Sequence, residues 1–240
     1  MISYSNTVNE ICESGVDTVI IPVGSIEQHS SHLPIGTDYY LSKSLSEAIA
    51  ERMEALLLPP LPISTCYEHK GKKASSICMR PITFYQMLQD IVICLYQQGF
   101  KKVVLVLGHG GIFIAGPAVR ELNAMYPDLH VIISQAENVD MQGVTETKGE
   151  IHAGERETSM MMHLHGDLVK TDLMKDNDYL PDCPQSYLNY TTVLRVSKTG
   201  AWGEPSYATA EKGKLLFEHS VDGHVECIRK TFAYLEEKNK

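Results

Sequence analysis

The chain lacks the features that would assign it to several broad classes of protein. No apolar run in its 240 residues approaches the ~20 residues that a membrane-spanning helix needs. The first fifteen residues, MISYSNTVNEICESG, have neither a basic start nor an apolar stretch, so we expect no signal peptide. The formal net charge of -9 argues against non-specific binding to nucleic acid or to an anionic membrane. We therefore expect a cytoplasmic protein that binds neither.

Cysteine motifs are absent as well. The 6 cysteines are scattered along the chain, and none forms a C-x-x-C pair. This pattern is typical of reduced thiols and not of a disulfide framework. Hydrophobic residues make up 43% of the sequence and charged residues 21%, which is the balance of a globular protein. A length of 240 residues suffices for one sizeable core, and we predict a single domain over residues 1–240.

Short β-branched runs alternate with stretches of helical periodicity. The clearest strand is expected at residues 102–107 (KVVLVL), which are nearly all apolar, as in a strand covered on both faces. Further strands are expected at residues 17–23, 56–62 and 130–134. Helices are expected at residues 38–54, 81–98, 115–125, 154–165 and 208–237, the last with a break near Gly223. This alternation predicts an α/β fold, a three-layer α/β/α sandwich with a largely parallel sheet.

Polar clusters follow three of the predicted strands. The segment GSIEQHSSHLPIGTD follows residues 17–23, GHGG follows residues 102–107, and HAGERETS comes after residues 130–134 and a loop. Parallel sheets place ligands beyond the carboxyl ends of their strands. We therefore expect the three clusters to meet at one edge of the sheet.

The first cluster offers two carboxylates and an imidazole. Glu27 and His29 are two residues apart, so in an extended chain both side chains could approach one metal ion or two adjacent ions. Asp38 stands at the start of a predicted helix, where its two oxygens could bridge two cations. The alternative is that Asp38 only caps the helix and that His29 and His32 are polar loop residues.

The second cluster is a histidine among glycines. His109 stands between Gly108, Gly110 and Gly111, directly after a predicted buried strand. Such glycines are costly in backbone entropy and make sense where the backbone comes close to a ligand, although a plain turn is the alternative. The loop lacks the Lys-Ser/Thr pair of a P-loop, which disfavours a phosphate site.

The third cluster contains His152, Glu155 and Glu157. If the segment is helical, Glu155 lies on the face of His152, and Glu157 is rotated by roughly 200° from Glu155. Only one glutamate should then reach a given metal ion, unless the helix begins late; the other would hold a partner or the helix N-terminus. The alternative is a capped acidic helix start. Carboxylates and imidazoles without thiolate suit Zn, Mn or Fe, and so many donors fit a two-metal hydrolase.

These motifs resemble the creatininase family, which comprises creatinine amidohydrolase and its relatives. The three clusters are similar to that family's G-S-x-E-Q-H-G-P-H-L-P-L-G-T-D, N-G-H-G-G-N and H-A-G-E-x-E-T-S elements. Residues 203–213 are similar to its G-D-P-x-x-A-T-A-E-K-G stretch. The similarity runs in the same order from about residue 20 to about residue 215.

The resemblance implies a ligand set of five residues. Glu27, Asp38 and His109 would hold one divalent ion, and His29, Asp38 and a later carboxylate would hold the other. For that carboxylate we favour Glu155 over Glu157. Creatinine-cleaving relatives are thought to take it from the segment after the loop histidine, where this chain has Gly111.

The resemblance also implies an activity. A metal-bridging hydroxide would attack the carbonyl of a small-molecule cyclic amide or formamide, and His152 or Glu157 would move the proton to the leaving nitrogen. The alternatives are a peptidase-like member, a deformylase acting on a nucleotide-derived formamide, and a metal-binding protein without catalysis. Relatives form hexamers, so we expect a homo-oligomer.

Several departures concern the predicted pocket and not the ligands. Ser30 and Ser31 stand where the family has Gly-Pro, and Leu107 and Ile112 replace the asparagines flanking the glycine loop. After Glu68 and His69 the chain reads KGKKASS, and its lysines, Lys70, Lys72 and Lys73, could meet an anionic substrate or form a solvated basic loop. The sole tryptophan, Trp202, does not precede the H-A-G element. These departures favour a substrate other than creatinine.

Overall fold

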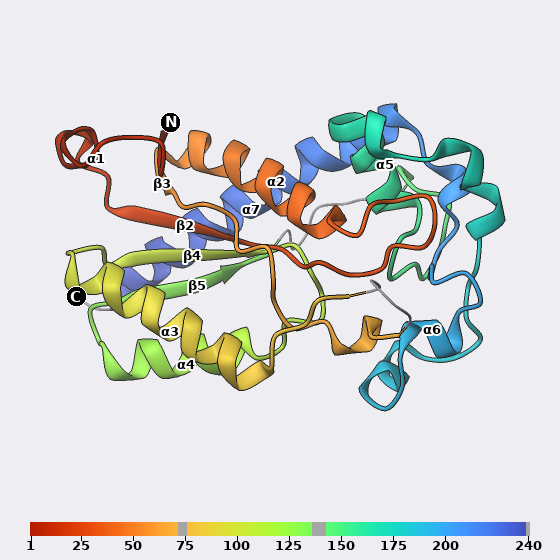
Figure 1. The fold of residues 1–240 in the computed structure, drawn as a ribbon. Coiled ribbons are helices and arrows are strands. Elements are labelled where there is room, and N and C mark those ends of the chain that lie inside the picture. The colour runs from red at the N-terminus through yellow and green to blue at the C-terminus, as the bar shows by residue number, and fades with distance from the viewer. Residues whose placement is uncertain (72–75, 136–142, 239–240) are drawn as a thin grey trace.

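A parallel sheet lies at the centre of the computed structural model, which describes residues 1–71, 76–135 and 143–238 (Figure 1). Its strands are β1 (Ile2–Ser3), β2 (Thr18–Val23), β3 (Leu56–Leu57), β4 (Lys102–Leu107) and β5 (His130–Ser134). They are arranged in the order β1-β3-β2-β4-β5, and all neighbours are parallel. Val23 at the end of β2 is paired with Leu107 at the end of β4. The loops that follow these two strands therefore start at the same level of the sheet.

Helices cover both faces of this sheet. The α-helices are α1 (Val8–Ser14), α2 (Thr37–Met53), α3 (Pro81–Gln97), α4 (Ala115–Met125), α5 (Glu155–His165), α6 (Val193–Val196) and α7 (Ala210–Lys238). The short 3-10 helices are η1 (Tyr67–His69), η2 (Gly166–Leu168), η3 (Thr171–Leu173), η4 (Lys175–Asn177), η5 (Gln185–Asn189) and η6 (Pro205–Tyr207). Val103 and Leu105 of β4 pack in a core with α3 and α4, whereas Val104 and Val106 pack in a core with α2 and α7. The predicted α/β/α sandwich is confirmed.

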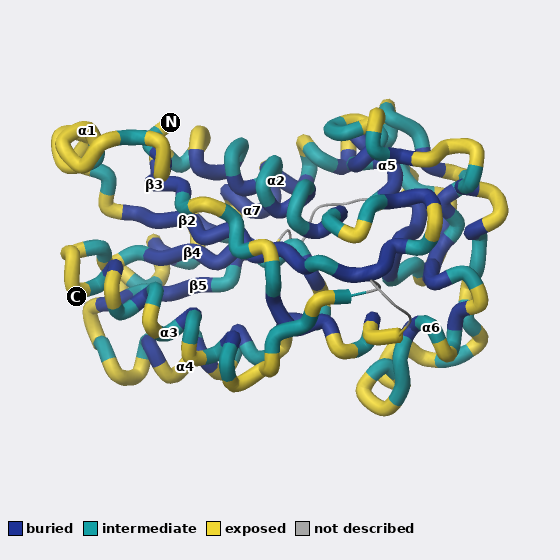
Figure 2. Tube along the Cα trace, in the orientation of Figure 1, coloured by how far each residue is buried: buried dark blue, intermediate teal, exposed yellow. Residues whose placement is uncertain are grey.

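Buried residues occupy the strands and the inner faces of the helices (Figure 2).

The predicted break in the last helix is wrong, because α7 is continuous and Gly223 is buried within it. A glycine in a helix interior costs about 1 kcal/mol relative to alanine. Val221, Val225 and Ile228 pack into the core and offset that cost.

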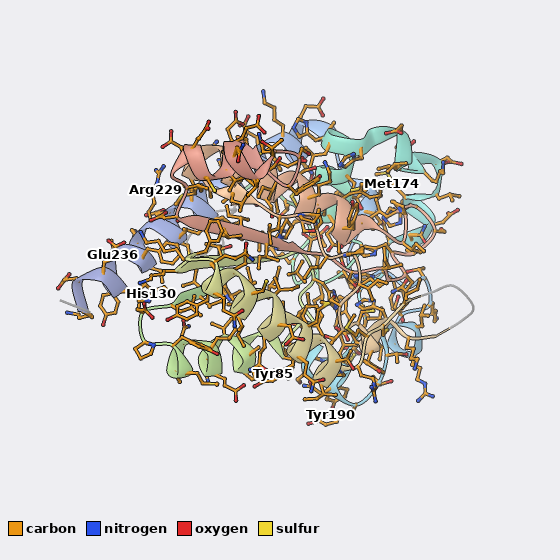
Figure 3. The ribbon with its side chains drawn as sticks, turned by 60° about the vertical axis from the view of Figure 1, so that its left-hand side comes forward. Tyr85, His130, Met174, Tyr190, Arg229 and Glu236 are labelled. Atoms are coloured by element: carbon orange, nitrogen blue, oxygen red, sulfur yellow. The ribbon has the colours of Figure 1, made fainter. Side chains whose placement is uncertain are left out.

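A third apolar cluster lies beyond the carboxyl ends of the strands. It contains Met161 of α5, Leu41 of α2 and Met174, which Figure 3 labels in this part of the molecule. Helix α5 packs along α7, and the segments around α5 and α6 extend past the end of the sheet (Figure 1). These segments cover the edge where the polar clusters were expected. Within the described ranges, no helix is both long and apolar enough to cross a membrane.

Candidate metal centre

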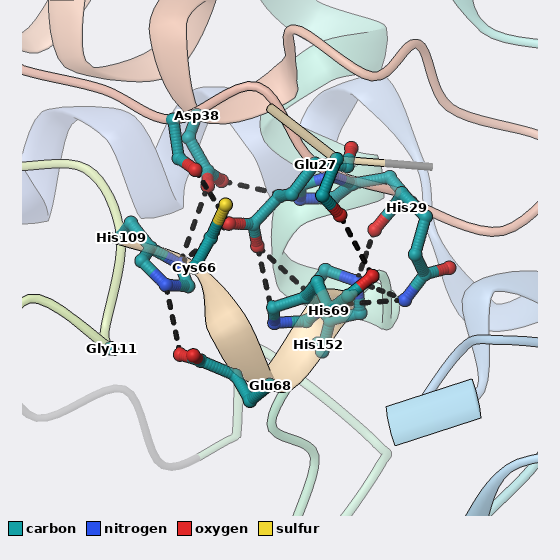
Figure 4. Close-up of polar contacts among 12 residues, drawn as sticks. Glu27, His29, Asp38, Cys66, Glu68, His69, His109, Gly111 and His152 are labelled. Carbon is teal, nitrogen blue, oxygen red and sulfur yellow. Dashed lines mark hydrogen bonds and ion pairs between the residues drawn. The ribbon is translucent and has the colours of Figure 1, made fainter. Parts of the chain in front are cut away.

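Four predicted ligands converge beyond the ends of β2 and β4 (Figure 4). Glu27 and His29 lie in the loop after β2, Asp38 is the second residue of α2, and His109 follows β4. Glu27 and His29 are fully buried, and Asp38 is 1% exposed. A Cβ at Gly108 would lie 2.7 Å from the carbonyl oxygen of Asp38, so a glycine lets β4 end against the start of α2. The strand ends bring these side chains together as expected.

Asp38 lies between the two histidines of this cluster. Its Oδ1 is 3.2 Å from His29 Nε2, and its Oδ2 is 3.5 Å from His109 Nδ1. Glu27 Oε2 is 3.1 Å from the same nitrogen of His109. The two oxygens of Asp38 therefore face two different imidazole rings.

Backbone carbonyls orient two of the imidazole rings. His29 Nδ1 donates to the carbonyl of Glu27 at 3.1 Å, and His152 Nε2 donates to the carbonyl of Gln28 at 2.7 Å. A carbonyl oxygen only accepts, so these nitrogens carry hydrogen, and the opposite nitrogen of a neutral ring holds a lone pair. His29 thus turns Nε2 towards Asp38, and His152 turns Nδ1 towards Glu27 Oε1, 3.8 Å away.

The two glutamates at the start of α5 have different surroundings. Glu157 Oε2 is 3.8 Å from His29 Nε2 and accepts a hydrogen bond from the backbone of Ala153 at 2.6 Å. Glu155 Oε1 instead accepts from Lys212 Nζ at 2.6 Å. Glu155 Oε2 accepts from the backbone N–H groups of residues 146 and 147. The structure therefore places Glu157 in the cluster and Glu155 outside it.

The expectation that Glu155 shares a helix face with His152 holds only if the helix includes His152. Helix α5 begins only at Glu155, Ala153 has a left-handed φ of 48°, and Gly154 is extended. His152 is therefore not in phase with the helix. This late start turns Glu157, and not Glu155, towards His29.

The donor atoms of the cluster fit divalent cations. The described part of the chain contains three groups of donor atoms, and none includes a cysteine. Within each group, all donor atoms lie within 4.8 Å of one another. The groups are Glu27-His29-His152, Glu27-His69-His109 and His29-Asp38-Glu157. Glu27 Oε1, His29 Nε2 and Asp38 Oδ2 are buried and make no hydrogen bond to any described residue. An unsatisfied buried polar atom costs about 1–3 kcal/mol, which a bound cation would remove.

Burial and mutual charge shift the pKa values in the cluster. Burial raises the pKa of Glu27 to about 7, and the charge of Asp38 acts in the same direction. Burial lowers the pKa of His29, but Asp38 outweighs it and raises this pKa to about 10. Burial also raises the pKa of the Glu157 carboxyl. The raised pKa values mean that protons bound to these side chains offset the negative charge of the buried carboxylates. Bound cations could offset the same charge instead.

A match to a protein-family model shows which class of metal-binding protein this chain belongs to. The model for creatininase (creatinine amidohydrolase) matches residues 5–228 of the chain. The chain belongs to the creatininase family. It is therefore a metal-dependent amidohydrolase, and the resemblance of its motifs is confirmed.

Relatives of this creatininase-family chain differ in their named substrates. The mycofactocin precursor peptide peptidase of Mycobacterium ulcerans is 28% identical, over 94% of each chain. The creatinine amidohydrolase of Pseudomonas putida is 28% identical over 91% of each chain. A crystal structure of creatininase has a TM-score of 0.82 at 26% identity and covers 96% of this chain and 98% of its own. Other solved forms at 25% and 26% identity, both with a TM-score of 0.80, are a Zn-Zn type and a Mn creatininase.

Two residues of the creatininase-like centre were not assigned from the sequence. Glu68 and His69 both belong to η1, and His69 Nε2 is 3.2 Å from Glu27 Oε1. Gln28 donates its side-chain amide to His69 Nδ1 at 3.2 Å. The signal that could have found them is an ionisable pair that follows the predicted strand at residues 56–62, as the other clusters follow theirs.

A cavity of about 740 Å³ leads to the cluster. His109, His152 and Glu157 line it, together with aromatic side chains at its mouth, Tyr67, Phe113 and Tyr190. Tyr190 is 86% exposed and lies at the outside of the molecule in Figure 3. The cavity therefore has a polar end at the cluster and a partly apolar entrance.

The described residues that depart from the family pattern are not among those that line this cavity; they are Ser30, Ser31, Lys70, Leu107, Ile112 and Trp202. Trp202 is buried and pairs its backbone with His152, and it is not among the residues that line the cavity. His32 is buried and contacts Thr158 Oγ1 at 3.0 Å, away from the donor groups. Lys70 is exposed, with its Nζ 5.1 Å from the ring centre of Tyr67. The other lysines of that loop, at positions 72 and 73, are outside the described residues.

Cysteine sulfur does not enter the centre. All six cysteines are free, and the Sγ of buried Cys66 is 3.0 Å from that of Cys78. Burial raises the pKa of the Cys66 thiol, and its hydrogen bond with Cys78 adds to this effect. A protonated thiol is a poor metal ligand, which agrees with an oxygen and nitrogen donor set.

Proposed function

We propose that this creatininase-family chain hydrolyses the C–N bond of a cyclic amide or formamide at a pair of divalent metal ions. Asp38 carries the proposal, because its two oxygens face His29 and His109 separately. Glu27, Asp38 and His109 would hold one ion, and His29, Asp38 and Glu157 the other. Glu157 takes the place proposed above for Glu155. Zn, Mn and Fe all suit these donors.

When bound, such ions supply an acidified water and positive charge beside the carbonyl oxygen of the substrate. The residues of the chain supply the proton transfer. His152 presents Nδ1 to the cluster and lies in the wall of the cavity. Burial lowers its pKa, and the charge of His29 lowers it further, so the neutral ring is ready to accept a proton. His152 then delivers this proton to the leaving nitrogen.

A substrate screen tests the proposed reaction. Metal-loaded protein is assayed with cyclic amides, N-formyl compounds and N-acetylated short peptides, and the His152→Ala variant is assayed in parallel. We expect equal amounts of new carboxylate and amine from one class. His152→Ala should keep its metal and lose about 10²-fold or more in kcat. No hydrolysis of any class by metal-loaded protein would contradict the proposal and favour a metal-binding protein without catalysis.

A peptide amide is the second candidate substrate. The cavity of about 740 Å³ suits a ligand much larger than a small cyclic amide, and its mouth carries exposed Phe113 and Tyr190. Arg195 also lines it, and the Arg195 side chain has no polar partner among the described residues. Such a cation could meet a peptide carboxylate or the phosphate of a nucleotide-derived formamide. A relative named as a peptide peptidase supports the first of these. Cleavage confined to the peptides of the screen would establish this candidate.

We also propose that residues 1–240 form one creatininase-like domain, as the family match over residues 5–228 supports. A cytoplasmic location and a homo-oligomer, a hexamer by family resemblance, remain proposals. The net charge of -9 supports the expectation that nucleic acid is not a partner.

A further inference from the structure

Glu68 contacts the edge of His109 that faces away from the other carboxylates. Glu68 Oε1 is 3.0 Å from His109 Nε2. The other ring nitrogen, Nδ1, faces Glu27 and Asp38 at 3.1 and 3.5 Å. Because a carboxylate accepts a hydrogen bond, the contact with Glu68 favours the ring form with hydrogen on Nε2. That form leaves the lone pair of Nδ1 for a cation.

The other three imidazoles of the cluster, those of His29, His69 and His152, have uncharged hydrogen-bond partners at the nitrogen that faces away from the carboxylates. His29 and His152 donate to the backbone carbonyls of Glu27 and Gln28, and His69 accepts from the Gln28 amide. Among these four rings, only His109 has a carboxylate beside the nitrogen that faces away from Glu27 and Asp38. A carboxylate hydrogen-bonded to a metal-binding histidine fixes the ring and raises the basicity of the ligating nitrogen.

Gly111 provides the space that Glu68 occupies. A Cβ at this position would overlap Glu68 Oε1 and also His109 Nε2 (Figure 4). Position 111 is where creatinine-cleaving relatives are thought to take a ligand carboxylate. In this chain the glycine instead lets a carboxylate from η1 reach the back of His109.

The backbone around Glu68 is well anchored. His69 N–H donates to the carbonyl of Cys66 at 3.0 Å, and Ser76 Oγ donates to the carbonyl of His69 at 2.7 Å. The side chain of Glu68 is 17% exposed and lies in the cavity wall. Its position is therefore set by a short helical turn and not by contacts with solvent.

We propose that Glu68 is a positioning residue for the metal ligand His109, and that Gly111 is required for this contact. The proposal rests on the proposed function, in which His109 holds an ion through Nδ1. Glu68 acts through the ring and not on the substrate. Its loss should therefore weaken metal binding before any substrate is present.

Metal affinity measured without substrate tests the proposal. Zn²⁺ dissociation constants are obtained by competition with a chromophoric chelator, and the absorption spectrum of Co²⁺-loaded protein is recorded. Glu68→Ala should weaken the binding of one ion towards 100-fold and change the cobalt spectrum. Glu68→Gln should weaken it nearer to tenfold, because its amide oxygen still accepts from Nε2 but has no charge. Glu13→Gln, an exposed carboxylate-to-amide change in α1, should leave both readouts unchanged.

Three results separate the possible failures. Wild-type affinity and spectrum in the Glu68 variants would overturn the positioning role, even if KM for a substrate rises. If the wild-type protein itself binds no zinc, the proposed function fails instead. If Glu68→Ala does not fold, Glu68→Gln decides, and unchanged zinc affinity in that variant overturns the role.

Discussion

At the residue scale, Glu155 and Glu157 show how two neighbouring carboxylates acquire different roles. Glu155 joins α5 to Lys212 of α7 and to the backbone of residues 146 and 147, whereas Glu157 points to His29. Charge-assisted hydrogen bonds of this kind stabilise a fold by about 1.5–3 kcal/mol each. The first glutamate is thus a structural residue, and the second belongs to the cluster.

We expect Glu155→Gln to lower the free energy of unfolding by about 1–3 kcal/mol at neutral pH without loss of metal. Burial raises the pKa of Glu155, but Lys212 and two backbone amides outweigh it and leave the pKa below its ordinary value of 4.5. A carboxyl whose pKa is lowered by folding stabilises the fold at pH values above its ordinary pKa. This stability is lost as the pH falls through the folded-state pKa. The difference between variant and wild type in urea unfolding should therefore shrink below about pH 4.5. A difference that is constant with pH would contradict this role.

Ser30 has a left-handed backbone with φ of 62°, at the position where the family has glycine. Its hydroxyl lies 2.6 Å from Asn177 Oδ1 and 2.8 Å from the carbonyl of Thr199. Ser30→Ala keeps the strain and loses the hydroxyl, so it should destabilise by about 1–2 kcal/mol. Ser30→Gly also loses the hydroxyl but relieves roughly 1 kcal/mol of strain, so it should be close to neutral. Thermal unfolding of both variants checks this order, and a glycine variant no more stable than the alanine variant would refute it.

At the element scale, the longer strands could be predicted from the sequence because their apolar pattern is local. Lys102–Leu107 and His130–Ser134 coincide with the predicted strands. The strand expected at residues 56–62 is shorter: β3 is Leu56–Leu57, and beyond the two prolines Leu61 pairs with Val23 as an isolated bridge. Strand β1 was not predicted, because two residues are too short to show periodicity.

The site was predictable only as far as it depends on strand ends. That rule brought together Glu27, His29, Asp38 and His109 from two separate segments. The identity of the later carboxylate depends on where α5 begins and on Lys212, which is 57 residues away from Glu155. The start of α5 was predicted to within one residue, whereas the contact with Lys212 is long-range and leaves no trace in local spacing.

Gly213 sets the approach of α7 to α5, and hence the position of Glu157. A Cβ at Gly213 would overlap the backbone carbonyl oxygen of Ser159. Gly213→Ala gains about 1 kcal/mol of helix propensity, but the overlap costs about 1–3 kcal/mol or more. We expect the free energy of unfolding, measured by chemical denaturation, to fall by up to about 2 kcal/mol, and zinc binding to weaken.

The control for Gly213→Ala is Gly116→Ala in α4, where an added Cβ meets nothing within 4 Å. It should be neutral or stabilising by up to about 1 kcal/mol. Equal effects of the two alanines would mean that close packing of α5 on α7 is not what Gly213 provides.

At the scale of the whole molecule, the candidate ligands and the cavity mouth belong to different parts of the fold. Asp38, His109 and Glu157 stand at or near the ends of elements packed in the apolar clusters. The mouth is formed largely by loop residues such as Tyr190 and Phe113. Under the proposed function, a rigid frame holds the metal ions while loops determine the substrate.

Metal content by atomic emission spectrometry tests the central claim most directly. The wild-type chain and Glu155→Gln should each hold two divalent ions per chain, and Asp38→Ala should lose both, because Asp38 Oδ1 faces His29 and Asp38 Oδ2 faces His109. Circular dichroism confirms that the variants are folded. Two ions per chain in folded Asp38→Ala, or loss of metal in Glu155→Gln with retention in Glu157→Gln, would contradict the account.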